Sequence, residues 1–192
     1  MTDYGAAMAG AVVTQTISSA GTSVKQVPAI LNKITQVMRM PEAYFAGLRD
    51  VLDIGGGKYD LLTNVLADMG IRNWVLDPYN RSKEHNEFVV RMLRAHPADM
   101  AICSNVLNVI KEPEARSAIH HLIKTLIDPR EQRAYFTVYE GDRTSKGKKT
   151  TRGWQANKPA KSYLMELRSH YESVTLCSNK LIVCDGFKRD RR

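Results

Sequence analysis

The sequence of 192 residues contains only three cysteines and has no long apolar run. Without an apolar stretch of about eighteen residues, no transmembrane helix is expected. Cys103, Cys177 and Cys184 lie in apolar, strand-like segments and have no partners at metal-ligand spacing. We therefore expect free thiols buried in a reducing, cytoplasmic environment, and no metal site. Residues 1–24 lack the basic start and continuous apolar core of a signal peptide, and we expect them to form a flexible arm.

The composition predicts one folded domain. Apolar residues make up 43% and charged residues 25% of the chain, which is ordinary for a soluble globular protein. No internal repeat or low-complexity linker divides the sequence. We expect a single domain over residues 25–187, followed by a basic tail at 188–192.

Two short apolar segments, each ending in a carboxylate, are the most informative part of the chain. Residues 51–60 read VLDIGGGKYD, an apolar run with an acid and three glycines, followed by a helix-like segment. Glycine lets a backbone approach a ligand closely, and the next helix offers it unpaired N–H groups. Residues 74–77 form a second apolar run that ends in Asp77. Two parallel strands with acids at their tips suit a ligand that contains a ribose.

The position of the first acid distinguishes between ribose-containing cofactors. In the dinucleotide fingerprint, G-x-G-x-x-G follows directly on apolar strand residues. Here Asp53 stands two residues before Gly55, and no third spaced glycine follows Gly57. An NAD-linked oxidoreductase is therefore the least favoured hypothesis.

The acid-x-Gly-x-Gly loop resembles the first motif of class I S-adenosylmethionine (SAM) methyltransferases. In that family the first acid lies near the methionine amino group, the glycines border the ribose and methionine, and the second acid takes the ribose hydroxyls. Residues 98–110 stand where the family carries its fourth strand, at whose tip substrate meets cofactor. The cofactor-binding residues that the resemblance implies are Asp53, Gly55, Gly56, Gly57, Asp77, Pro78, Tyr79, Asn105 and Val106.

A narrower resemblance extends over residues 51–163. Residues 76–79 and 105–116, with the late Gly-Trp-Gln segment at 153–155, are similar to the methyltransferase family associated with DNA phosphorothioation gene clusters. Gly56 departs from that group, which usually carries cysteine there.

The acceptor chemistry is less defined. Amino-methylating DNA enzymes carry Asp/Asn-Pro-Pro-aromatic after the fourth strand, whereas residues 104–107 read SNVL. Cys103 lacks the preceding proline of cytosine-C5 enzymes. Asn105 could orient a substrate or cap the loop. Glu140 and Asp142 are candidate catalytic bases, with loop solvation as the alternative.

Positive charge is concentrated in the last third of the chain. Residues 130–192 hold 15 Lys and Arg against 7 Asp and Glu, and account for the whole net charge of +8. The densest part, residues 143–152, is polar, and we expect a solvated loop there. It could bind nucleic acid through phosphates and a stacked base, or could only aid solubility. The candidate nucleic-acid-binding residues are Arg143, Lys146, Lys148, Lys149, Arg152 and Trp154.

Apolar periodicity predicts an α/β, Rossmann-like sheet, mostly parallel and ending in an antiparallel hairpin. Only about twenty residues, most of them in a predicted helix, separate Asp77 from the strand at Met100. The usual third strand of the class is therefore expected to be missing or vestigial. Helices are predicted over 26–40, 58–69, 83–95, 113–127 and 159–170, and strands over 48–54, 73–77, 133–139, 172–177 and 180–184. Residues 98–110 are expected to begin as a strand and to end in a loop.

Three hypotheses remain open. The leading one is a SAM-dependent methyltransferase that acts on a nucleic acid or a nucleic-acid-derived substrate. The second is a methyltransferase for a small molecule or a protein, in which the basic segment is a lid. The third is a binding module that retains the fold and binds SAM or nucleic acid without catalysis.

Overall fold

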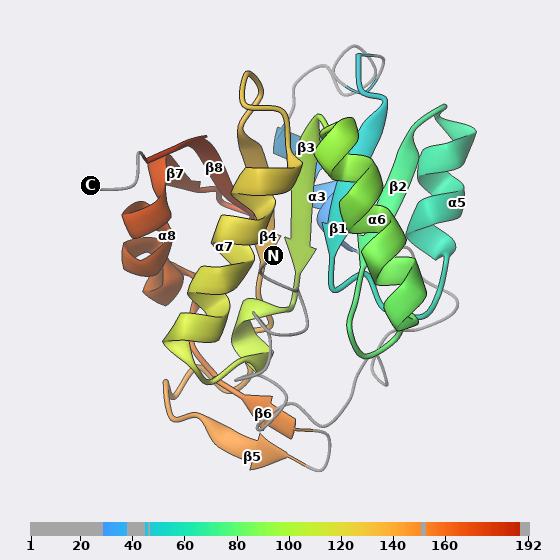
Figure 1. Cartoon of the computed structure of the whole chain (residues 1–192). Helices are drawn as coiled ribbons and strands as arrows, with labels where there is room; N and C mark the ends of the chain where they lie inside the picture. The colour runs from blue at the N-terminus through green and yellow to red at the C-terminus, as the bar shows by residue number, and fades with distance from the viewer. Residues whose placement is uncertain (1–28, 38–44, 46, 151–152, 189–192) are drawn as a thin grey trace.

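A six-stranded sheet forms the centre of the computed structural model, which describes residues 29–37, 45, 47–150 and 153–188 (Figure 1). The strand order is β2-β1-β3-β4-β8-β7. The strands β2, β1, β3 and β4 are parallel, whereas β8 runs antiparallel to β4 and to β7. The strands are β1 (Asp50–Ile54), β2 (Arg72–Leu76), β3 (Met100–Ser104), β4 (Arg133–Thr137), β7 (Tyr171–Leu176) and β8 (Ile182–Phe187).

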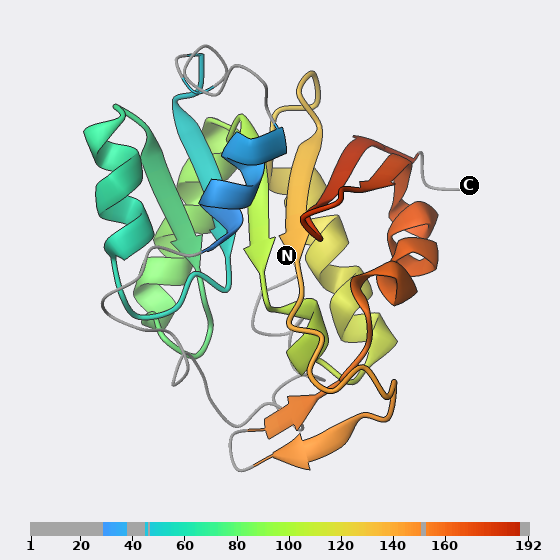
Figure 2. The same ribbon diagram turned by 180° about the vertical axis from the view of Figure 1, so that it is seen from behind.

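Helices cover both faces of this sheet. Figure 1 shows α6 and α7 in front of it, and Figure 2 shows α3 on the opposite face. The strands serve both layers because successive side chains alternate: Met100 and Ile102 pack with α3 and α5, while Ala101 packs with α6 and α7. The helices are α3 (Ala29–Val37), α5 (Leu61–Asp68), α6 (Lys83–Ala95), α7 (Pro113–Leu126) and α8 (Leu164–His170), with short 3-10 turns η1 (Leu107–Val109) and η2 (Ala160–Tyr163).

Local sequence explains where the helices after β2 and β3 begin. Ser82 caps α6, since its hydroxyl accepts a hydrogen bond from the N–H of His85 (3.2 Å). Pro113 opens α7 at a position where a helix needs no backbone N–H. Val89 and Leu93, four residues apart, bury the inner face of α6.

The predicted fold class is confirmed. Within the described residues the structure contains the expected helices and strands; most bounds differ by a few residues, and α6 has the predicted ones. Strand β2 is an edge strand, and no strand lies beyond it in the part of the chain that the structure describes. The predicted arm at 1–24 and most of the basic tail lie outside the described residues.

The basic segment corrects one expectation. It was predicted as a loop, but β5 (Lys148–Thr150) pairs antiparallel with β6 (Gly153–Gln155), and the two form a hairpin below the main sheet in Figure 1. The sequence hides this hairpin because Lys148 and Lys149 are exposed and β5 has no apolar alternation.

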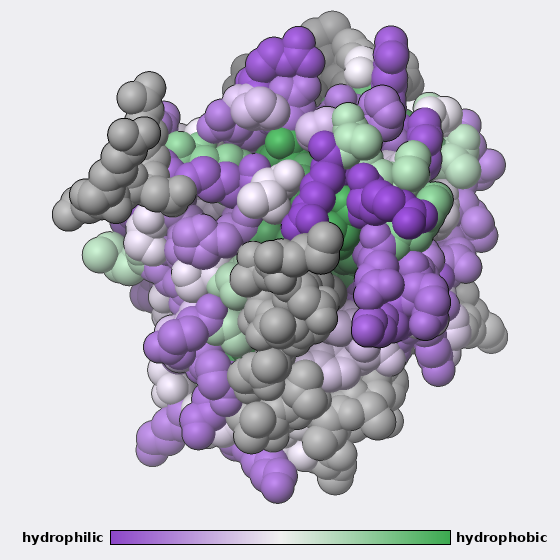
Figure 3. Space-filling model, in the orientation of Figure 1, coloured by the Kyte–Doolittle hydropathy of each residue, from purple (hydrophilic) through white to green (hydrophobic). Residues whose placement is uncertain are grey.

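The remaining compositional expectations concern membranes, metals and thiols. Within the described ranges, no helix is both long and apolar enough to cross a bilayer. Those ranges also contain no group of His, Cys, Asp and Glu arranged to hold a metal ion. Cys103 and Cys184 are buried free thiols, whereas Cys177 is only partly buried. Figure 3 shows a face covered mainly by hydrophilic residues, with hydrophobic ones visible between them near its centre.

Candidate active site

The carboxyl ends of the parallel strands bring together loops that are far apart in the sequence. Gly55 follows β1, and its N–H donates to the carbonyl oxygen of Leu76 at the end of β2 (2.7 Å). The N–H of Asn105, after β3, donates to the carbonyl oxygen of Thr137 at the end of β4 (2.8 Å). The predicted cofactor positions therefore meet at one edge of the sheet, the lower edge in Figure 1.

Two glycines of the loop after β1 are required by backbone conformation or by close packing. Gly55 has a φ of 70°, and a Cβ added there would overlap with Cγ2 of Val106 in the loop after β3. A Cβ at Gly56 would overlap with Oδ2 of Asp53. The glycine loop is thus in close contact with two other predicted cofactor residues, Asp53 and Val106.

Asp53 lies buried beneath this loop, with 4% of its surface exposed. The amide nitrogen of Asn73 donates a long hydrogen bond of 3.4 Å to its Oδ2. Burial, with a smaller contribution from the charge of Asp77, raises the pKa of Asp53 to about 7 despite the lowering effects of the Asn73 hydrogen bond and of Arg81. The ionised carboxylate is therefore poorly compensated, and a cation placed near it would be stabilising.

Asp77, directly after β2, is also 4% exposed but is fully engaged. Its Oδ2 accepts hydrogen bonds from the N–H of Gly57 (2.9 Å) and the side-chain amide of Asn80 (3.0 Å). Its Oδ1 accepts from the N–H groups of Tyr79 (2.9 Å) and Asn80 (3.0 Å). A carboxylate offers about four acceptor positions, and these four hydrogen bonds occupy them. Because the donors belong to both loops, Asp77 joins the glycine loop to the loop after β2.

The loop after β2 holds the two other predicted positions, Pro78 and Tyr79, both half-buried. The hydroxyl of Tyr79 is buried and has no hydrogen-bond partner among the described residues. Burial and the charges of Asp77 and Glu112 raise the pKa of Tyr79. Since Glu112 immediately precedes α7, the loop after β2 lies close to the segment that follows η1.

The two asparagines after β3 have different environments. Asn105 has a φ of 59° and an exposed side chain at the strand tip, where an acceptor could reach it. Asn108 is buried: its Oδ1 accepts from the N–H of Tyr139 (3.2 Å), and its amide nitrogen donates to Oε1 of Gln155 (3.2 Å). Asn108 therefore ties η1 to the end of β4 and to the hairpin, and only Asn105 is available to a ligand.

The two candidate bases are held in ways that oppose proton uptake. Oε2 of Glu140 lies 2.7 Å from Nζ of Lys180 and 2.6 Å from a guanidinium nitrogen of Arg143. The Lys180 hydrogen bond is the main cause that lowers the pKa of Glu140 to about 2. Hydrogen bonds from Thr144 lower the pKa of Asp142 as well. A lowered pKa makes each carboxylate a weaker base near neutral pH, and the catalytic role of both residues stays a prediction.

The six residues predicted to bind nucleic acid differ in their environments. Lys146, Lys148 and Lys149 are exposed, while Arg143 is paired with Glu140. Trp154, on β6, is half-buried: a Cβ at Gly147 would overlap with its ring, and Nζ of Lys111 lies 5.3 Å from its ring centroid. Arg152 lies outside the described residues.

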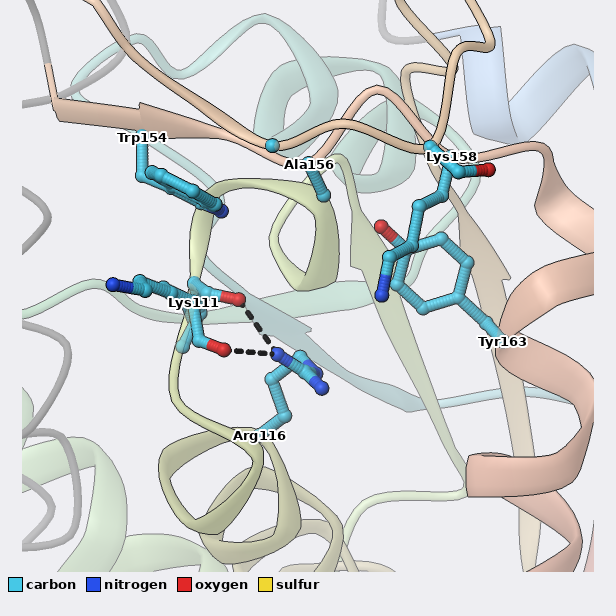
Figure 4. Close-up of a pocket in the computed structure, with 9 residues that line it drawn as sticks. Lys111, Arg116, Trp154, Ala156, Lys158 and Tyr163 are labelled. Carbon is cyan, nitrogen blue, oxygen red and sulfur yellow. Dashed lines mark hydrogen bonds between the residues drawn. The ribbon is translucent and has the colours of Figure 1, made fainter.

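A cavity of about 250 Å³ lies between the hairpin and the start of α7 (Figure 4). Its wall includes Trp154 and four residues that the sequence did not single out. Arg116 spans the floor, donating to the carbonyl oxygens of Ile110 (2.8 Å) and Lys111 (2.9 Å). The four additional residues are Lys111, Arg116, Lys158 and Tyr163.

Comparison with known proteins supports the fold. Neither family models nor curated proteins gave a match to the sequence. An O-methyltransferase family protein from Burkholderia thailandensis matches at 17% identity over 84% of this chain, with a TM-score of 0.51; the match covers 60% of that protein, less than two thirds of its length. The 1,6-didemethyltoxoflavin-N1-methyltransferase of the same organism matches at 15% identity over 96% of this chain and 89% of its own, with a TM-score of 0.59. At these identities the likeness concerns the fold.

Proposed function

We propose that the protein is a SAM-dependent methyltransferase. The observation that carries this proposal is the meeting of the glycine loop, Asp53, Asp77 and Asn105 at one edge of a sheet with this fold. The N1-methyltransferase that shares the fold was solved with S-adenosylhomocysteine bound, which supports the same choice of cofactor.

The described residues fit that cofactor. The amino group of its methionine part would supply the cation that the buried carboxyl of Asp53 lacks. Asp77 would take the ribose hydroxyls if the side-chain amide of Asn80 released Oδ2. The unpartnered hydroxyl of Tyr79 and the backbone around Gly55 supply further polar contacts and space.

The chain's part in the reaction is chiefly alignment. Bound SAM supplies a methyl group already activated on a sulfonium, so that the protein must mainly orient the acceptor in line with it. The exposed side chain of Asn105 is placed for this role at the tip of β3. Because Glu140 and Asp142 are poor bases, the site favours an acceptor atom that needs little help in losing a proton.

For the acceptor we propose a nucleic acid or a nucleic-acid-derived molecule. The exposed lysines of the basic hairpin region, Lys146, Lys148 and Lys149, support this choice because they can neutralise phosphates. The resemblance to the phosphorothioation-associated group supports it as well. A small-molecule acceptor is the second candidate, favoured by the cavity of about 250 Å³, which would hold one ring system.

Calorimetric titration with SAM and with S-adenosylhomocysteine, with NADH as control, tests the cofactor. We expect saturable binding of both and none of NADH. The Asp77→Asn variant should bind at least about tenfold more weakly, because an amide cannot replace both carboxylate oxygens. Failure of the folded protein to bind either ligand would overturn the proposal. Transfer of a labelled methyl group to DNA, RNA or extracts would then identify the acceptor and separate an enzyme from a binding module.

A further inference from the structure

The cavity between the β5–β6 hairpin and the start of α7 carries features of a built binding site. Tyr163 is 3% exposed, yet its buried hydroxyl has no hydrogen-bond partner among the described residues. Figure 4 shows this hydroxyl and the amino group of Lys158 pointing toward the cavity. No ion pair of Lys158 occurs in the described part of the chain. A donor and a cation are thus directed into the same cavity.

A rigid aromatic wall closes the cavity on the hairpin side. The ring of Trp154 is held against Gly147, where any side chain would overlap with it, and the Lys111 side chain runs along it. Its position therefore does not depend on a ligand. A flat ring can stack on the indole face along which Lys111 now runs, because the exposed Lys111 side chain can move aside.

The charge of the cavity comes from its lysines more than from its arginine. The Arg116 guanidinium is neutralised by Glu166, to which its Nε donates a hydrogen bond of 2.9 Å. Its Nη1 donates to the carbonyl oxygens of Ile110 and Lys111. Lys111 and Lys158 have no such acidic partner among the described residues. The net positive charge that faces a ligand is therefore set by these two lysines.

We propose that this cavity binds a nucleotide unit, with its base on Trp154 and its phosphate held by Lys158 and the hydroxyl of Tyr163. A volume of about 250 Å³ limits the occupant to one such unit. The unit can be a free mononucleotide or part of a single-stranded nucleic acid. This site would bind the acceptor proposed above. Only the role of the bound unit as methyl acceptor rests on the proposed function.

Calorimetry with AMP, GMP, CMP and UMP, each compared with its nucleoside and with inorganic phosphate, tests the inference directly. We expect at least one mononucleotide to bind about tenfold more tightly than its nucleoside, because only the mononucleotide carries the charge. Lys158→Ala should remove this preference, and Trp154→Leu should weaken the mononucleotide and the nucleoside alike by about tenfold.

Two further variants guard against misfolding as the cause. Tyr163→Phe removes one hydroxyl and keeps the ring, and it should weaken only the phosphate-bearing ligands. Lys161→Ala removes an exposed lysine of η2 that does not line the cavity, and it should change nothing. Equal mononucleotide affinity in the wild type, Lys158→Ala and Trp154→Leu would overturn the inference.

A single-stranded oligonucleotide distinguishes the two sources of the unit. If the unit belongs to a nucleic acid, the oligonucleotide binds more tightly than the mononucleotide, and Lys148→Ala with Lys149→Ala weakens only the oligonucleotide. If it is free, these variants alter neither. Titration of the same samples with S-adenosylhomocysteine separates the two proposals. If S-adenosylhomocysteine binds and no nucleotide does, the nucleotide site is overturned and the proposed cofactor stands.

Discussion

The N–H of Gly57 donates a 2.9 Å hydrogen bond to Oδ2 of Asp77, and this contact joins the loop after β1 to the loop after β2. The other oxygen of Asp77 accepts from the N–H groups of Tyr79 and Asn80. One buried carboxylate therefore fixes the relative position of the two loops that we propose to hold the cofactor. Its replacement should affect both cofactor affinity and local stability.

Asp77→Asn is expected to lower the free energy of unfolding by about 1–3 kcal/mol, because one buried N–H group loses its acceptor. Affinity for S-adenosylhomocysteine should fall at least about tenfold. Urea denaturation and calorimetry measure the two effects. Asn80→Ala is the matched control, since it removes a neighbouring amide and leaves the Asp77 carboxylate. Its cofactor affinity should not fall, because Oδ2 of Asp77 is then free for the ribose hydroxyls. Unchanged affinity in Asp77→Asn would contradict the site assignment.

Asp53 should make stability depend on pH. Its pKa is raised from 3.8 to about 7 in the folded protein. Between these values the unfolded chain releases the proton and the folded protein keeps it, so rising pH lowers the free energy of unfolding. The stabilisation is complete below pH 3.8 and is lost as the pH rises through about 7.

Asp53→Asn removes this titration. From pH 5 to pH 8, the free energy of unfolding of the wild type should fall relative to that of the variant by about 3 kcal/mol. Urea denaturation of both proteins at the two pH values measures the difference. Parallel pH profiles would show that Asp53 ionises normally in the folded protein.

Gly55→Ala should be more harmful than Gly70→Ala, although both glycines have left-handed backbones with φ of 70° and 76°. Each alanine pays about 1 kcal/mol for that conformation. Only the alanine at 55 also overlaps with Val106, whereas a Cβ at 70 meets no atom within 4 Å. We expect an additional loss of about 1–3 kcal/mol and loss of cofactor binding in Gly55→Ala. Equal stability and cofactor affinity in the two variants would contradict the packing described for the loop.

Features that depend on the local pattern could be predicted from the sequence. Apolar runs followed by Asp53 or Asp77 define β1 and β2 because buried parallel strands need continuous apolar residues. The bounds of α6 follow from its cap at Ser82 and its apolar spacing. The meeting of the predicted cofactor residues then follows from parallel strand order alone.

Features that depend on contacts between distant segments could not be predicted in this way. Two hydrogen bonds hold the hairpin in place. The side-chain amide of Gln155 donates to the carbonyl oxygen of Tyr139 (3.1 Å), and the N–H of Ala156 donates to the carbonyl oxygen of Asn108 (2.8 Å). Arg116 and Glu166 are 50 residues apart and carry no motif. One of the two ion pairs of Glu140 likewise depends on a distant residue, Lys180, whereas the other is formed with Arg143 of its own loop.

Glu140→Gln is expected to lower the stability of the fold and to leave methyl transfer nearly unchanged. Glu140 accepts from the N–H of Ala160 (2.9 Å) and pairs with Lys180 and Arg143, so the variant should unfold at lower urea concentration at pH 7. The pKa of Glu140 is lowered to about 2, and the ionised form therefore stabilises the fold above its usual pKa of 4.5. This advantage over the variant should disappear as the pH falls through about 2.

Binding of S-adenosylhomocysteine and methyl transfer at pH 7 should stay within a few-fold of the wild type in Glu140→Gln. Asp142→Asn, which changes a neighbouring exposed carboxylate, is the control for local charge. A loss of methyl transfer with normal stability and normal cofactor binding would restore Glu140 as the catalytic base.

Replacing Lys146, Lys148 and Lys149 with alanine should weaken nucleic-acid binding and make it less sensitive to salt. Each lysine that contacts a phosphate of a single strand contributes about 0.7 to the slope of log affinity against log salt, so the slope should fall by about 2. The control replaces Lys83, Arg91 and Arg94 on α6, which lowers the net charge equally at another surface. If both triple variants lose affinity to the same extent, overall charge and not the hairpin attracts nucleic acid. If only the hairpin variant loses affinity and keeps S-adenosylhomocysteine binding, the lysines act as a phosphate-binding surface beside the cofactor loops.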